Sequence, residues 1–183
     1  MANNAAYVSA GKPNVSGAIY RAAKGTTLPT ASGSQLSADF KAIGYISADG
    51  VKNNNSPSTD KVSAWGGDAV LYTQGDKEDT FKFTMMETMN VEVLKAVYGS
   101  KNVTGELGNG LTVDATSDDA EEAVWVIDMI LKGDVAKRIV IPCGKITELD
   151  EISYADTDAI GYGVTVSAIP YDGRKTHIEY IGA

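Results

Sequence analysis

Short runs with strand-like alternation cover most of this chain and limit its fold more than any other feature. The clearest run is residues 79–86, in which apolar and polar side chains alternate strictly, as in a half-buried strand. Further strand-like runs are 15–23, 61–65, 69–74, 111–115, 123–131, 137–142, 146–152, 159–170 and 177–181. Turn residues separate neighbouring runs, with Gly66-Gly67-Asp68 forming a hairpin-like turn and Gly144-Lys145 a second turn.

One segment, residues 90–98, has a convincing helical pattern. Asn90 can cap its N-terminus, and Gly99 is well placed to end it. Its apolar stripe is formed by Val91, Leu94, Val97 and Tyr98. A helix of this length is marginal alone, so we expect it to dock on a sheet. A single helical turn is also expected within residues 34–42, where Leu36 and Phe40 lie four residues apart.

No strand–helix–strand rhythm is visible, which favours antiparallel strands joined by hairpins. We therefore predict a mainly β fold: an antiparallel β-sandwich or barrel with one flanking α-helix at about residues 90–98. The run 123–131 has apolar residues on both faces, interrupted by Asp128, and should be a central strand covered on both sides. A length of 183 residues fits one domain. We expect a flexible N-terminal arm at residues 1–14 and a single β domain at 15–183.

A long polar stretch, residues 44–68, begins and ends like a strand but reads as a loop at about 48–60. It contains an Asp-Gly, three asparagines and a Ser-Pro, and no His, Cys or phosphate-binding glycine pattern. Long ordered loops are uncommon and are usually functional. A long loop without chemistry indicates a contact device between subunits rather than an active site. Its candidate contact residues are Asp49, Val51, Asn53, Asn54, Asn55, Ser56, Pro57 and Ser58.

The net charge of −8 argues against a protein that wraps nucleic acid, because such proteins present basic patches. The first residues lack the basic and apolar regions of a signal peptide, so we expect a soluble chain made in the cytoplasm. The most apolar run, 123–131, is too short to span a bilayer, so no membrane association is expected. The acids at 118, 119, 121 and 122 are interpreted as a solvated edge.

A search for catalytic, metal and cofactor residues finds none, and we predict that the protein is not an enzyme. His177 is the only histidine and is expected at the surface, while Cys143, the only cysteine, is expected at a strand end. These two residues cannot supply a zinc site, and no acidic group has EF-hand spacing. The glycines of GELGNG at 105–110 give only a weak nucleotide pattern. Five scattered aromatics could line a sugar or peptide surface, but we expect core and interface positions: Tyr7, Tyr45, Trp65, Tyr72 and Tyr171.

The order of these segments resembles the major tail tube proteins of long-tailed, non-contractile (siphovirus-type) bacteriophages. The residues that carry the resemblance are GYISADGVKNNNSPSTDKVSAWGGDAVL, then KEDTFKFTMMETMNVEVLKAVYG, then AVWVIDMILKGDVAKRIVIPCGKITELDEI. It covers residues 15–181, and Cys143 stands where a polar residue would be usual.

The resemblance implies a virion structural protein whose copies form six-subunit rings that stack into a tail tube. In that arrangement the long loop reaches the neighbouring ring, terminal arms add contacts, and DNA passes through the lumen without specific binding. The implied partners are further copies of the chain, a tape measure protein, a tail terminator and tail-tip proteins. The tube would be assembled in the host bacterial cytoplasm.

Two other functions stay open on the sequence. The first is a β-sandwich module that binds carbohydrate or a cell surface, against which the missing signal peptide counts. The second is a small hydrolase, disfavoured by the lack of a nucleophile–base combination.

Overall fold

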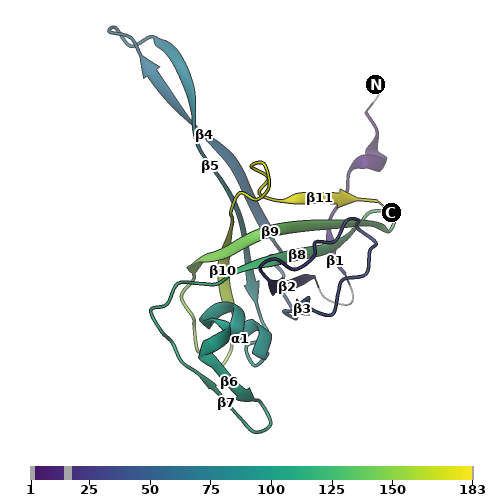
Figure 1. Ribbon diagram of the computed structural model, residues 1–183. Helices are drawn as coiled ribbons and strands as arrows, with labels where there is room; N and C mark the ends of the chain where they lie inside the picture. The colour runs from purple at the N-terminus through teal and green to yellow at the C-terminus, as the bar shows by residue number, and fades with distance from the viewer. Residues whose placement is uncertain (1–2, 15–17, 183) are drawn as a thin grey trace.

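The computed structural model describes residues 3–14 and 18–182 and shows a mainly antiparallel β protein with one α-helix (Figure 1). This confirms the predicted fold class. The helical elements are η1 (Ala5–Tyr7), α1 (Val91–Tyr98) and η2 (Ser100–Asn102). The strands are β1 (Lys12–Pro13), β2 (Ile19–Ala23), β3 (Lys41–Ala42), β4 (Lys52–Ser63), β5 (Ala69–Met85), β6 (Val103–Glu106), β7 (Gly110–Val113), β8 (Glu122–Leu131), β9 (Val135–Leu149), β10 (Tyr162–Ala168) and β11 (Ile178–Ile181).

Nine of the described strands form one antiparallel sheet in the order β3-β2-β8-β9-β10-β5-β4. The two remaining members lie off this path, since β1 pairs with β8 and β11 pairs with β9. A separate hairpin, β6–β7, lies with α1 at one end of the molecule (Figure 1). The long strands β8 and β9 therefore form the centre of the sheet, and β4 lies at its edge.

Strand β8 is covered on both faces, as its two-sided apolar pattern predicts. Trp125 and Ile127 belong to a core cluster that also contains the buried residues of α1. Val124 and Val126 belong to a second cluster on the other face, against which Leu28 and Leu36 pack. A sheet buried on both sides at its centre gives the body its hydrophobic stabilisation.

Strand β9 runs without a break through the turn predicted at Gly144-Lys145, so that prediction is wrong. Pro142 lies beside a register shift between Trp125↔Ile141 and Ala123↔Gly144, where a strand tolerates proline. A Cβ on Gly144 would lie 2.7 Å from Cδ1 of Trp125 and 2.9 Å from Cγ1 of Val166. Glycine therefore leaves room here for the indole ring, whose Nε1 donates a hydrogen bond to the Gly144 carbonyl at 3.3 Å.

Helix α1 has the predicted caps and buries a wider face than the predicted stripe. The Asn90 Oδ1 accepts a hydrogen bond from the Glu92 amide at 3.0 Å, and Gly99 follows with φ +94°. The buried side chains are Val93, Leu94 and Ala96, whereas Val91, Val97 and Tyr98 are partly buried against the same cluster. All four residues of the predicted stripe therefore contact the core, and Val93 and Ala96 are buried in addition.

The first part of the body departs from expectation in its local structure. Residues 34–42 contain turns and the short strand β3, so the predicted helical turn is wrong. Leu36 and Phe40 share the second core cluster although they do not share a helix. The strand predicted at 15–23 corresponds to β2, which begins at Ile19; residues 15–17 of the predicted run lie outside the described residues.

A buried ion pair ties this segment to the centre of the sheet. Asp128 and Arg138 lie directly opposite each other on β8 and β9. The guanidinium donates two hydrogen bonds to the carboxylate, from Nε to Oδ1 at 2.7 Å and from Nη2 to Oδ2 at 2.8 Å. The third guanidinium nitrogen donates to the carbonyls of Ala31 and Ser34. Arg138 therefore satisfies a buried carboxylate and holds residues 31–34 against the sheet.

Candidate assembly surface

The stretch predicted as a long loop is one strand of a hairpin arm. Strand β4 pairs with β5 from Lys52↔Lys82 to Ser63↔Ala69, with register shifts after Pro57 and Val62. The loop predicted at 48–60 is therefore present only at 48–51, and the prediction is wrong for 52–60, which are strand. The asparagines have low strand propensity, but cross-strand pairing with Phe81, Thr80 and Asp79 of β5 outweighs that local preference.

The eight predicted contact residues lie at the root and middle of this arm, and none lies at its tip. Asn53, Asn54, Asn55, Ser56, Pro57 and Ser58 belong to β4. Asp49 lies in the turn before β4, where its amide donates to Ser47 Oγ at 3.2 Å. Val51 packs, partly buried, against the main core. The predicted set is contiguous along the chain but is not one surface.

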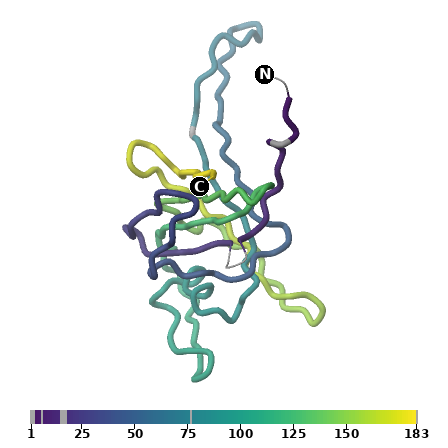
Figure 2. The backbone as a smooth tube through the Cα atoms, turned by 90° about the vertical axis from the view of Figure 1, so that its right-hand side faces the viewer, coloured from purple at the N-terminus to yellow at the C-terminus, as the bar shows by residue number. Residues whose placement is uncertain are grey.

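The arm extends well beyond the body of the molecule (Figures 1 and 2). Every residue of β4 is exposed, and β4 is paired along one side only. Long unpaired edges promote uncontrolled association, and proteins limit this with proline and lysine. Pro57, Lys52 and Lys61 occupy β4. These three residues hinder the free edge of β4 from pairing with strands of other molecules.

The end of the arm is apolar, in contrast to its stem. We call Val62, Trp65, Leu71 and Tyr72 the tip cluster; all four side chains are exposed, Trp65 completely. Val62 lies opposite Leu71, and Lys61 lies opposite Tyr72. Successive cross-strand pairs face opposite sides of a ribbon, so apolar side chains are present on both faces. Such a ribbon is suited to insertion between two surfaces.

The sequence contains a signal for this cluster in its scattered aromatics. The prediction of core positions for them is wrong, because all five are exposed: Tyr7, Tyr45, Trp65, Tyr72 and Tyr171. Trp65 and Tyr72 flank the Gly66-Gly67-Asp68 turn, which the structure confirms between β4 and β5. Aromatic residues on either side of an exposed hairpin turn indicate a contact surface.

The root of the arm is held by a buried carboxylate, Asp79 in β5. Asn53 Nδ2 of β4 donates to Oδ1 at 2.9 Å, while Thr176 Oγ1 and His177 Nδ1 each lie 2.5 Å from Oδ2. Burial raises the pKa of Asp79, but the hydrogen bonds from Thr176, His177 and Asn53 outweigh this, so the pKa lies below its ordinary value. Asp79 therefore links both strands of the arm to the segment that precedes β11.

His177 takes part in this root and not in a free surface, which corrects the sequence prediction. Its side chain is 14% exposed, and its ring packs edge to face against Phe81 with 5.3 Å between the ring centroids.

Cys143 is buried inside β9 instead of at a strand end, and its Sγ contacts Glu122 Oε2 at 3.4 Å. Burial and then the Glu122 carboxylate raise the pKa of the thiol, the reverse of an activated nucleophile.

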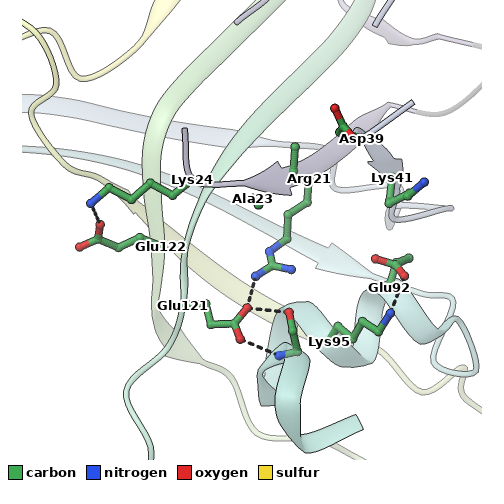
Figure 3. Close-up of a pocket in the computed structure, with 11 residues that line it drawn as sticks. Arg21, Ala23, Lys24, Asp39, Lys41, Glu92, Lys95, Glu121 and Glu122 are labelled. Atoms are coloured by element: carbon green, nitrogen blue, oxygen red, sulfur yellow. Dashed lines mark hydrogen bonds and ion pairs between the residues drawn. The ribbon is translucent and has the colours of Figure 1, made fainter. Parts of the chain in front are cut away.

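A surface groove of about 540 Å³ lies between β2, α1 and the start of β8 (Figure 3). Six of its charged side chains form ion pairs: Arg21 with Glu121 at 2.8 Å, Lys95 with Glu92 at 3.0 Å, and Lys24 with Glu122. Ser100 donates its amide and hydroxyl to Glu121. The two other charged side chains, Asp39 and Lys41, hydrogen-bond to the Ser37 hydroxyl and the Ala38 carbonyl, so the four acids and four bases of the groove balance in charge.

The acidic residues 118–122 were interpreted as a solvated edge, and they are paired as well as exposed. Asp118 binds Lys101 at 3.0 Å and Asp119 binds Lys145 at 3.1 Å. The hydrogen bond from Lys101 lowers the pKa of Asp118.

Within residues 3–14 and 18–182, no group of three or more His, Cys, Asp or Glu is placed to hold a metal ion. No helix in the described part of the chain is long and apolar enough to cross a membrane.

The N-terminal segment leaves the body on the same side as the hairpin arm (Figures 1 and 2). Its described residues include β1, which pairs with β8, and the exposed Tyr7 and Val8. Two extensions therefore project from one end of a compact sheet. A β-sheet body with projecting, exposed extensions and a self-neutralised groove is the architecture of an assembling structural subunit.

Comparison with known proteins supports this class. A model of the phage tail tube protein family matches residues 1–183, and the chain belongs to that family. It is therefore a structural protein of the phage virion tail that assembles with copies of itself and with other tail proteins. No curated protein sequence matches it. The cryo-EM structure of the anti-feeding prophage cap (AFP tube terminating cap) is similar over 100% of both chains at 9% identity and a TM-score of 0.46, too remote to carry an argument.

Proposed function

We propose that this protein polymerises as stacked six-subunit rings to form the tail tube of a long-tailed, non-contractile phage, through which DNA passes into the host. The observation that carries the proposal is the hairpin arm, whose 12-residue edge strand is wholly exposed and whose tip is apolar. Exposed apolar surface at the end of a projecting ribbon is stabilised by burial against another subunit.

The physics of ring formation fits this sheet. Joining the sheets of neighbouring subunits around a ring removes the open edges that would otherwise associate at random. Rings that stack with a small rotation form an open helical polymer. The exposed tip and the N-terminal segment would supply the contacts between rings, and the six contact residues in β4, Asn53 to Ser58, would line the arm where it leaves its own ring.

The net charge of −8 supports the passage of DNA without binding. An acidic lumen repels phosphate, so the nucleic acid slides instead of adhering. We propose that the lumen is lined by a strand face rich in Asp, Glu, Ser and Thr; a positive potential along the channel of an assembled tube would contradict this. The tube would act without catalysis or cofactor. It would be assembled in the host cytoplasm around a tape measure protein, between a terminator and tail-tip proteins.

Negative-stain microscopy of the concentrated protein tests the proposal. Hollow tubes or rings are expected. Persistent monomers that bind a glycan array would instead favour a carbohydrate- or surface-binding module. A trimmed variant, in which Asn-Gly replaces residues 60–73 and joins the paired residues Thr59 and Gln74, should stay folded and form no tubes.

A matched control keeps the arm and its apolar tip. The substitution Asp60→Ser changes only one exposed polar side chain near the tip. This variant should assemble like the wild type. If the trimmed variant still formed tubes, the arm would not be the stacking device.

A further inference from the structure

A second exposed apolar surface is formed by Tyr45, Met86 and Met89, which we call the receiving patch. The chain around Tyr45 runs antiparallel to the end of β5: Ile46 bridges Met85, and the Met86 amide donates to the Tyr45 carbonyl at 2.9 Å. Tyr45 and Met86 therefore lie opposite each other on one face. Met85, on the other face, is completely buried.

The receiving patch and the tip cluster lie at opposite ends of one strand. Strand β5 begins at the arm tip and ends at Met85 beside α1, at the far end of the molecule (Figure 1). Seventeen residues of extended chain span roughly 55 Å at about 3.3 Å per residue. Two different apolar surfaces at opposite ends of one subunit are what a head-to-tail polymer requires.

The chemistry of the two surfaces is complementary. The tip presents the aromatic rings of Trp65 and Tyr72, and the receiving patch presents the thioethers of Met86 and Met89. Methionine adapts its shape and makes favourable sulfur–aromatic contacts. The nearby carboxylate of Glu87 accepts hydrogen bonds from the Tyr45 amide at 3.0 Å and Asn90 Nδ2 at 2.9 Å, so its oxygens are already engaged.

We propose that the receiving patch is the surface on which the tip cluster of a second copy of this chain docks, head to tail. The proposal rests on the proposed self-assembly and assigns the two surfaces that meet. Packing of one tip cluster on another would close two copies into a dimer and leave both receiving patches uncovered. Docking of a tip cluster on a receiving patch instead leaves one free tip cluster and one free receiving patch at every stage of growth, so the polymer can continue.

Cross-linking of full-length chains tests this assignment. In a Cys143→Ala background, Ala64→Cys places a thiol beside Trp65, and Thr88→Cys places one beside Met89 without altering either surface. A short bismaleimide should link the double-cysteine chain into a ladder of dimers, trimers and longer products. A mixture of the two single-cysteine variants should give dimers only, and each variant alone should stay monomeric.

Gly108→Cys supplies the matched control, because it lies in the turn between β6 and β7 at the same end of the molecule and a Cβ there meets open space. If Ala64→Cys formed ladders when combined with Gly108→Cys but not when combined with Thr88→Cys, the assignment of the receiving patch would be wrong. Cross-linked dimers of the Ala64→Cys variant alone would also overturn it, because they would show that two tips pack together. Ladders without tubes would support the docking pair while refuting the ring model. Tubes without a cross-link at Thr88 would refute the pair and leave the ring model standing. A chain that stays monomeric and gives no product refutes both.

Discussion

Two long hairpins in this protein, β8–β9 and β4–β5, have the same backbone pairing and opposite environments. The first is buried on both faces and contains Trp125, which is 1% exposed. The second carries the other tryptophan, Trp65, at full exposure on its tip. The first ribbon packs within its own chain along its centre, whereas the second packs against the body only near its root, through Phe81, Phe83 and Met85, and leaves the apolar side chains of its tip exposed. Strand formation and burial are thus separate properties of a segment.

The largest expected effect comes from the buried tryptophan. Trp125→Ala should lower the free energy of unfolding by about 3–5 kcal/mol, because the cavity it leaves lies between sheet and helix. Urea denaturation monitored by circular dichroism measures it. A change below about 1 kcal/mol would show that the two hairpins do not differ in burial as described.

The buried ion pair tests the polar side of the same contrast. Arg138→Met should cost about 3 kcal/mol, because it leaves the Asp128 carboxylate buried and uncompensated. The double variant Asp128→Leu with Arg138→Met should recover most of this in the same denaturation experiment. As a control, Lys82→Met breaks the exposed pair with Asp150 and should leave the urea midpoint unchanged.

The root of the arm should show an intermediate effect with a defined pH dependence. Asp79→Ala should cost about 1–3 kcal/mol at neutral pH, since Asn53, Thr176 and His177 lose their shared acceptor. The pKa of Asp79 is lowered in the folded state, so this carboxylate stabilises the fold fully above its ordinary pKa of 3.8. That contribution is lost as pH falls through the lower, folded pKa. Acid titration of stability should therefore be steeper for the wild type than for the variant; parallel curves would contradict the lowered pKa.

The smallest effect on stability should accompany a large effect on assembly. Trp65→Ala should change the free energy of unfolding by less than about 0.5 kcal/mol, because the side chain has no contact to lose within the subunit. Sedimentation velocity should nevertheless show that tubes or rings are lost. Full assembly of this variant would remove Trp65 from the proposed contact, whereas a matched loss of stability would mean that the arm is part of the fold.

The sequence was most reliable where the deciding interactions are local or periodic. It predicted helix 90–98 from its caps and the central strand at 123–131 from the apolar residues on both its faces, and both are present. It failed at Asn53–Ser58, whose conformation depends on pairing with residues 77–81, and at Gly144, whose role depends on Trp125 from another strand. Neither partner is near in sequence.

By itself, the sequence determined that this chain is a mainly β protein with one docked helix, and its residue order determined its family. Only the tertiary structure decided that the polar stretch is a strand, that Trp65 is exposed while Trp125 is buried, and that Asp79 joins the arm to His177. The physical reason is that propensity and periodicity are properties of neighbouring residues. Burial and hydrogen-bond partners depend instead on which distant strands lie side by side.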